Sequence, residues 1–66
     1  MVYKKVTLIG SSTESFDDAT DDALARAQAT LENVKWMEVE ELGVEVASVD
    51  EPEYQAEVKV AFEVEE

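Results

Sequence analysis

The chain's only tryptophan, Trp36, stands in residues 34–40, whose composition is typical of a strand. By strict alternation its companions on one strand face are Val34, Glu38 and Glu40, which makes that face mostly polar. An indole on a polar face can stack on a flat ligand, and aromatic pairs add about 0.5–1.5 kcal/mol beyond their buried area. Packing in the core or at a subunit interface is the alternative interpretation.

Gln55 falls among charged residues on the outward face of the last predicted strand. A side-chain amide both donates and accepts hydrogen bonds, which suits the edge of a ring with alternating carbonyl and N–H groups. A purely solvated glutamine is the alternative. If the preceding turn centres near 51–52, Gln55 lies opposite about Ser48, roughly 40 Å from Trp36 along a straight strand. Unless the hairpin bends sharply, one pocket can use both residues only from different chains, so we predict an inter-subunit pocket.

Two groups of carboxylates suggest other chemistry. Four aspartates in the expected helix have no calcium-loop spacing and are better explained as a solvated acidic face than as a cation site: Asp17, Asp18, Asp21 and Asp22. Four glutamates on the second predicted strand include possible acid–base pairs: Glu38, Glu40, Glu41 and Glu45. No apolar pocket is evident to separate their pKa values, so the sequence predicts no enzyme.

The Gly10-Ser11-Ser12 segment superficially resembles a phosphate-binding loop. It has one glycine and lacks the Gly-Lys-Ser/Thr signature of that loop. We therefore expect it to be a plain connection between a strand and a helix.

Composition narrows the classes of function further. The chain has no histidine and no cysteine, which excludes disulfides, thiolate zinc sites and the commonest general base. Its 17 Asp and Glu outnumber 5 Lys and Arg, giving a net charge of −12, and such a surface repels nucleic acid and anionic membranes. At about 1 M salt the Debye length is about 3 Å and exposed carboxylates cease to repel, which favours a halophilic cytoplasm. With no apolar run of membrane-span length and no visible signal peptide, we expect a soluble, cytoplasmic protein.

The elements that position these residues follow from the hydrophobic pattern. Residues 2–10 and 53–65 alternate as strands, and residues 34–49 form a strand with a predicted bulge or bend at Leu42-Gly43. Ser15 is the expected N-cap of a helix over 16–32. The helix has one apolar stripe rich in alanine, which lets it lie close to a sheet: Phe16, Ala19, Ala23, Ala27 and Leu31. The sequence predicts a single α+β domain over 1–66, with one helix on a three-stranded antiparallel sheet.

Size and geometry favour self-association. A domain of 66 residues buries only about 60% of the surface of its unfolded chain and is marginally stable alone. Without disulfides or a metal site, oligomerisation is the remaining support. The strand over 53–65 would be about 43 Å long, longer than a compact domain of this size. The hairpin must therefore curl around the helix, project beyond it, or both, and a projecting strand offers backbone groups to a neighbour.

The sequence resembles the dodecin family over nearly its whole length. The resemblance lies in the joint order and spacing of six segments, each weak alone: Val2-Tyr3-Lys4-Lys5-Val6, Ile9-Gly10-Ser11-Ser12, Ser15-Phe16, Ala23-Leu24-Ala25-Arg26-Ala27, Val34-Lys35-Trp36-Met37-Glu38-Val39 and Tyr54-Gln55-Ala56-Glu57-Val58. It implies a β-α-β-β subunit whose sheet curls around one helix, with twelve subunits closing into a hollow homododecamer.

The resemblance also implies a site. Flavins would stack in pairs at subunit interfaces, with Trp36 closing each side of the stack and Gln55 bonding the isoalloxazine edge. Glu45 matches a polar position near the ligand's side chain. Glu41 stands where an aspartate is expected, and Lys35 stands where an apolar residue is expected in halophilic archaeal members.

The expected function is therefore non-catalytic storage or sequestration of a flavin, with quenching of its photochemistry by the indole. An acidic assembly disfavours the FMN phosphate by Coulomb repulsion, so riboflavin or lumichrome is the expected ligand. FMN binding assisted by Lys35 is one alternative, and a structural or interaction shell without flavin is another. Because twelve copies each carry −12, we expect the assembly to require high salt.

Overall fold

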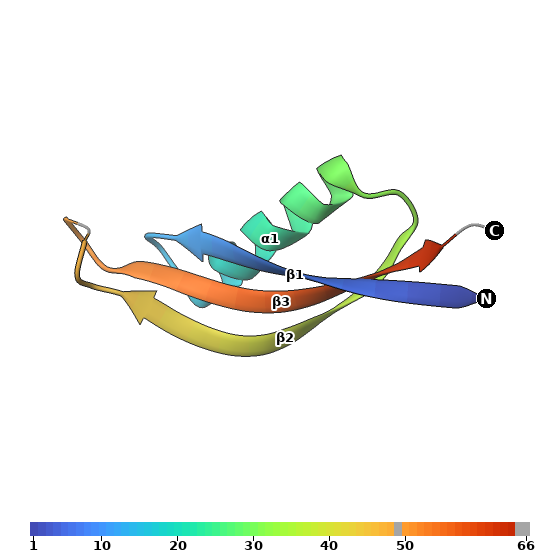
Figure 1. The fold of residues 1–66 in the computed structure, drawn as a ribbon. Helices are drawn as coiled ribbons and strands as arrows, with labels where there is room; N and C mark the ends of the chain where they lie inside the picture. The colour runs from blue at the N-terminus through green and yellow to red at the C-terminus, as the bar shows by residue number, and fades with distance from the viewer. Residues whose placement is uncertain (49, 65–66) are drawn as a thin grey trace.

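The structure is a computed structural model that describes residues 1–48 and 50–64. Four elements follow one another along the chain: β1 (Val2–Ser12), α1 (Phe16–Thr30), β2 (Val34–Glu45) and β3 (Glu53–Val64). The strands form one antiparallel sheet in the order β1-β3-β2, with α1 on one face (Figure 1). The predicted α+β, β-α-β-β fold is confirmed. The predicted strand ends at Val49 and Glu65 lie outside the described residues.

Helix α1 begins where the sequence predicts. The hydroxyl of Ser15 accepts a hydrogen bond from the backbone N–H of Asp18 at 3.0 Å, which makes Ser15 the N-cap. The helix ends at Thr30, two residues before the predicted end, because Leu31 already has an extended backbone. Asn33 then adopts a positive φ of 61°, a conformation that asparagine tolerates better than most residues, and the chain turns into β2.

Small residues let the helix lie close to the sheet. The predicted alanine stripe is confirmed, since Ala19, Ala23 and Ala27 are fully or almost fully buried and pack on the middle strand. Gly10 of β1 lies directly beneath this stripe, and a Cβ on it would stand 2.6 Å from the backbone nitrogen of Ala23. The contact fixes where α1 crosses β1.

The Gly10-Ser11-Ser12 segment is therefore not the connection that we expected. It continues β1 and pairs with residues 54–56 of β3, because the long third strand offers backbone partners along the whole segment. Residues 13–15 alone join β1 to α1.

The irregularities of β2 differ from the prediction. The register shifts between Val34 and Trp36 and again between Val39 and Glu41, so the extra residues are Lys35 and Glu40. The predicted bulge at Leu42-Gly43 is wrong, because Leu42 and Gly43 pair regularly with β3. The strand also ends at Glu45, earlier than expected.

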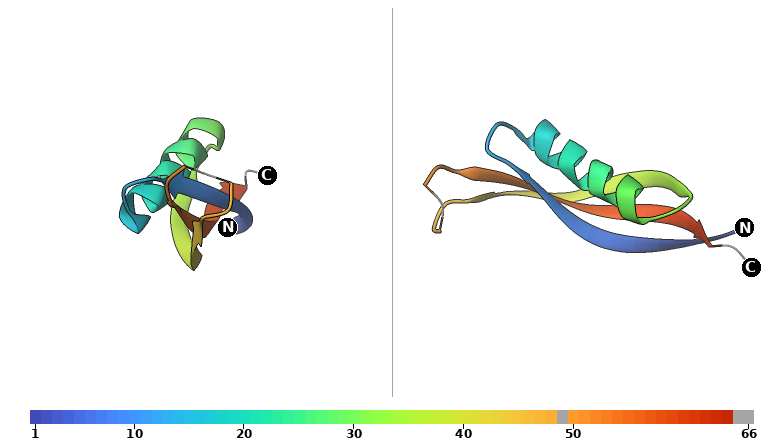
Figure 2. Two further views of the ribbon diagram at one scale, coloured as in Figure 1. Left: turned by 90° about the vertical axis from the view of Figure 1, so that its left-hand side faces the viewer. Right: turned by 90° about the horizontal axis from the view of Figure 1, so that it is seen from above.

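The β2–β3 hairpin projects beyond the helix, as its length predicted. The molecule measures 46 × 19 × 18 Å, and Figures 1 and 2 show the hairpin reaching past the end of β1 and away from α1. The helix packs mainly on β1 and β3 and only marginally on β2. Three apolar residues of β2 on the helix side of the sheet are thus left open, and we call them the β2 apolar strip: Val39, Leu42 and Val44, which are 50%, 54% and 44% exposed.

Candidate ligand-binding site

The bulge at Lys35 decides which residues share a face with Trp36. Val34 pairs with Phe62, whereas Trp36 pairs with Ala61, so the two side chains lie on opposite faces of the sheet. The prediction that Trp36 and Val34 share one face of the strand is therefore wrong. Trp36 lies on the face away from α1 and is 41% exposed, which leaves much of the indole free to contact a ligand.

Three neighbours hold the indole of Trp36. Its Nε1–H donates to Oε2 of Glu38 at 2.9 Å, and the ring of Tyr3 meets it edge-on, with centroids 5.0 Å apart at 65°. The ammonium of Lys5 lies 6.0 Å from the ring centroid. Tyr3 and Lys5 were not among the predicted site residues, because they lie more than thirty residues from Trp36 along the chain.

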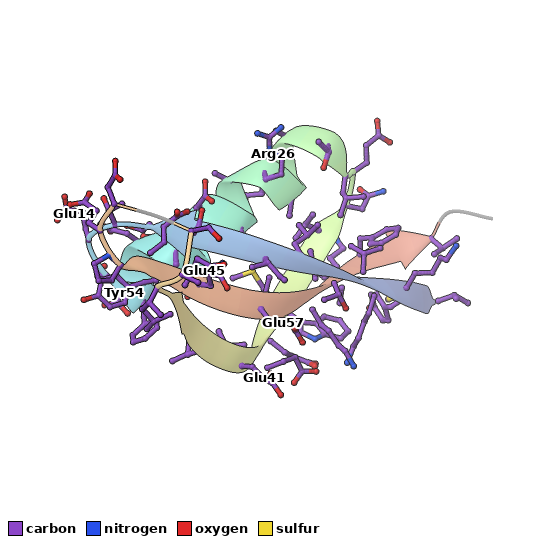
Figure 3. The ribbon with its side chains drawn as sticks, turned by 60° about the vertical axis from the view of Figure 1, so that its left-hand side comes forward. Glu14, Arg26, Glu41, Glu45, Tyr54 and Glu57 are labelled. Carbon is purple, nitrogen blue, oxygen red and sulfur yellow. The ribbon has the colours of Figure 1, made fainter. Side chains whose placement is uncertain are left out.

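A small open pocket lies further along the same sheet, beside Gln55. Its volume is about 100 Å³. Six residues from all three strands line it: Ile9, Glu41, Leu42, Gly43, Gln55 and Glu57. Figure 3 shows Glu41 and Glu57 on neighbouring strands, with Glu45 further toward the end of the hairpin. Sites for small organic ligands usually measure about 300–1,000 Å³, so this pocket holds only part of such a ligand.

The hairpin register corrects the predicted spacing of Trp36 and Gln55. Gln55 lies opposite Gly43, not Ser48, because the connection between β2 and β3 spans residues 46–52 and is longer than a tight turn. The β3 partner of Trp36 is Ala61, six residues from Gln55 and therefore about 20 Å away rather than about 40 Å. Trp36 is not among the residues lining the Gln55 pocket, so one chain does not join them.

The other predicted site residues are divided in the same way. Glu41 lines the Gln55 pocket. Glu45 pairs with Glu53 at the end of β2, and its Oε1 accepts from the backbone N–H of Ala47 at 3.2 Å. Lys35 forms an ion pair with Glu63 at 3.7 Å. The structure thus joins Glu41 with Gln55 and leaves Lys35 and Glu45 outside the pocket. Ile9 and Glu57 line it as well, and the sequence analysis did not select them.

Charge in this region is negative at the pocket and balanced beside Trp36. The residues that line the pocket include Glu41 and Glu57, which lie opposite one another, and no lysine or arginine. Near Trp36, hydrogen bonds from Lys5 and then from Trp36 lower the pKa of the Glu38 carboxyl below its usual value. A neutral ligand fits the pocket better than an anion.

The aspartates of α1 do not assemble a metal site. Asp22 instead accepts a hydrogen bond from the backbone N–H of Ser11 at 3.0 Å, tying the helix to β1. Across residues 1–48 and 50–64, no three acidic side chains are grouped as metal ligands. In the same part of the chain, the one helix is too short and too polar to span a membrane.

Comparison with known proteins gives a consistent result. The family model described as Dodecin matches residues 2–65. A curated protein named Dodecin from Thermus thermophilus is 43% identical over 65 residues, covering 98% of this chain and 94% of its own.

Solved structures agree closely with this fold. A T. thermophilus crystal structure has a TM-score of 0.86 at 43% identity, covering 98% of this chain and 96% of that one. The dodecin of Streptomyces davaonensis has a TM-score of 0.87 at 31% identity, with 98% and 96% covered. A Mycobacterium tuberculosis structure, titled as a calcium dodecin with a novel calcium-binding site, has a TM-score of 0.86 at 28% identity, with 98% and 93% covered.

Proposed function

We propose that this chain, which belongs to the dodecin family of small, dodecameric, flavin-binding proteins, stores riboflavin or lumichrome without catalysing a reaction. The observation that carries the proposal is that one chain presents two separated half-sites on one face of its sheet. An exposed indole lies at Trp36, and an amide lies at Gln55 in a pocket too small for a whole flavin. Neighbouring chains would combine these half-sites into pockets that hold flavins in stacked pairs.

The unpartnered surface of β2 supports assembly into a hollow homododecamer. The β2 apolar strip is exposed on the helix side of the sheet, and β2 is also an edge strand. A row of exposed apolar side chains on a projecting hairpin is costly in water and is relieved when another copy covers it. Because β2 is an edge strand, a copy that covers its helix side would also lie beside the opposite face, which carries Trp36 and Gln55.

The charge of the pocket supports a neutral flavin. Glu41 and Glu57 would lie near the ligand with no lining cation to offset them, which disfavours a phosphate carrying about two negative charges. Lys35, the cation expected to assist FMN binding in the alternative, forms an ion pair with Glu63 at 3.7 Å. Riboflavin and lumichrome are therefore favoured over FMN, which is the alternative ligand.

Quenching would follow from the contact between flavin and indole. An excited isoalloxazine stacked on Trp36 can accept an electron from the indole, and the return of that electron to the oxidised indole leaves both rings in their ground states. The protein would then limit flavin photochemistry while holding the flavin in reserve. The surplus of acidic residues is consistent with this role in a salt-rich, halophilic cytoplasm.

The test is a titration of riboflavin with apoprotein at about 1 M salt, followed by flavin fluorescence. We expect saturable quenching at one flavin per chain, abolished in Trp36→Ala. Trp36→Phe, which keeps a flat ring but not the electron-donating indole, should retain part of the binding, measured by equilibrium dialysis, and lose the quenching. Unchanged riboflavin fluorescence in wild type would overturn storage of riboflavin, and repetition with FMN and lumichrome would test the alternatives. Unchanged fluorescence of riboflavin, FMN and lumichrome alike would favour a structural shell without flavin. Steady consumption of NADH or NADPH by the flavin-loaded protein would favour an enzyme.

A further inference from the structure

The indole of Trp36 is held by an ion pair that bridges two strands. Nζ of Lys5 on β1 donates to both carboxylate oxygens of Glu38 on β2, at 2.9 and 3.0 Å. One of these oxygens, Oε2, also accepts the indole N–H at 2.9 Å. The carboxylate therefore lies between a cation and an indole donor, and all three of its hydrogen bonds are of the charge-assisted kind, which are the stronger ones.

Ala61 makes this arrangement possible. It lies on the middle strand β3, where it pairs with Lys5 on one side and with Trp36 on the other. Its side chain is a single methyl group and is fully buried, although it lies on the sheet face that α1 does not cover. The side chains of β1 and β2 thus meet above Ala61, and a larger residue there would separate them.

Two contacts restrain the indole of Trp36. Tyr3 approaches edge-on at 5.0 Å, and Glu38 fixes the Nε1 end of the ring. A half-exposed side chain without such contacts samples several rotamers, and ordering it on ligand binding costs affinity. Held by Glu38 and Tyr3, the indole is already oriented before a ligand arrives.

We propose that Glu38, held in place by Lys5, is a positioning residue that orients Trp36 for stacking. The inference rests on the proposed flavin site. It adds that the stacking surface of Trp36 is already oriented before the ligand binds. Its consequence is that removing the carboxylate frees the indole in the apoprotein and weakens flavin binding about 2- to 12-fold, the range expected when one side chain must be immobilised on binding.

Trp36 is the only tryptophan, so its fluorescence anisotropy in the apoprotein reports its own motion. Glu38→Leu should increase the fast component of that anisotropy decay and raise the riboflavin Kd about 2- to 12-fold. Glu38→Gln, which keeps an oxygen acceptor for the indole but loses the charge that pairs with Lys5, should change both properties in the same direction and by less than Glu38→Leu. Lys5→Met should give an intermediate effect, because Glu38 then lacks its cation.

Glu40→Leu is the matched control, since it removes a glutamate of the same strand whose partner is Lys59 at 3.3 Å. It should leave the anisotropy of Trp36 unchanged. If Glu38→Leu fails to fold, Glu38→Gln and Lys5→Met carry the comparison. Unchanged anisotropy in Glu38→Leu, or weaker binding without increased indole motion, would overturn the proposal. Freed indole motion in a protein that binds no flavin even as wild type would support positioning while refuting the proposed function.

Discussion

Gly43 of β2 lies directly opposite Gln55 of β3, in the regular part of the hairpin register. A Cβ placed on Gly43 would meet no atom within 4 Å, so the space beside the Gln55 amide is open because this position has no side chain. The relationship explains how a hairpin bearing long side chains on this face leaves access to Gln55. It also gives a way to close the pocket without disturbing the chain that forms it.

Filling this space should block the ligand and spare the fold. In Gly43→Val the new side chain enters the open pocket, so we expect riboflavin affinity to fall at least tenfold in the fluorescence titration. Chemical unfolding should show equal or slightly higher stability, because glycine is unfavourable inside a strand. Gly43→Ala is the size control and should bind better than Gly43→Val. Undiminished binding by Gly43→Val would place the ligand elsewhere.

Gly10 should respond in the opposite way. A Cβ there would collide with the backbone of Ala23, 2.6 Å from its nitrogen, and neither the helix nor β1 can give way freely. We expect Gly10→Ala to destabilise the protein by about 1–3 kcal/mol or more, as overpacking does in cores. Urea unfolding at a fixed salt concentration measures the loss. Wild-type stability in Gly10→Ala would mean that α1 does not lie as close to β1 as described.

Charge at the pocket should decide between neutral and phosphorylated flavins. Removing one carboxylate in Glu41→Gln or Glu57→Gln should improve FMN binding by at most about fivefold, the unscreened effect of a charge about 8 Å from a dianion in water, and by less as the salt concentration rises. Riboflavin, which is neutral, should change little. Glu51→Gln at the exposed tip of the hairpin is the control for net charge. Equal gains in all three variants would show that the overall field matters and the pocket does not.

Protonation of Glu38, the carboxylate beside Trp36, should give a transition at acid pH. The folded protein lowers the pKa of Glu38 from 4.5, chiefly through hydrogen bonds from Lys5 and then Trp36, with a Coulombic contribution from Lys59. Its stabilising contribution is therefore present above pH 4.5 and lost as the pH falls through the lowered folded-state value. Because the pair is exposed, the free energy involved is small, and the indole is the better probe.

Fluorescence anisotropy of Trp36 measured against pH follows that transition. We expect a constant signal from about pH 5 to 8 and increased indole motion below pH 4.5. Lys5 on β1 and Lys59 on β3 are the cations that act on this carboxylate. Glu38→Gln should lack the transition while retaining any change caused by general acid unfolding. The same acid transition in both proteins would assign it to other carboxylates.

The β2 apolar strip should control assembly. Val44→Asp replaces an apolar side chain that is 44% exposed in one chain with a charged one. Burying that charge under another copy of the chain would be unfavourable. We expect smaller species by analytical ultracentrifugation at about 1 M salt, and wild type should dissociate as salt falls. Ala25→Glu, on the exposed side of α1, is the control. An intact assembly of Val44→Asp would exclude this strip from the interface.

The sequence alone determined the elements and their order, for local reasons. Alternation identified β3, the alanine spacing identified the buried side of α1, and Ser15 marked where the helix begins. Gln55 was a candidate from its chemistry and Glu41 from the family resemblance, and both line the pocket. These features depend on periodicity and capping chemistry, which are properties of short segments.

The tertiary structure decided what depends on register. Two bulges in β2, at Lys35 and Glu40, determine which side chains share a face with Trp36, and the long hairpin connection sets Gln55 opposite Gly43. A single extra residue reverses the face of every side chain that follows it until the next irregularity. The sequence pattern around Lys35 did not reveal that shift, since either register leaves an acceptable strand. The approach of Lys5 and Trp36 above Ala61 likewise required the middle strand to bring two distant segments together.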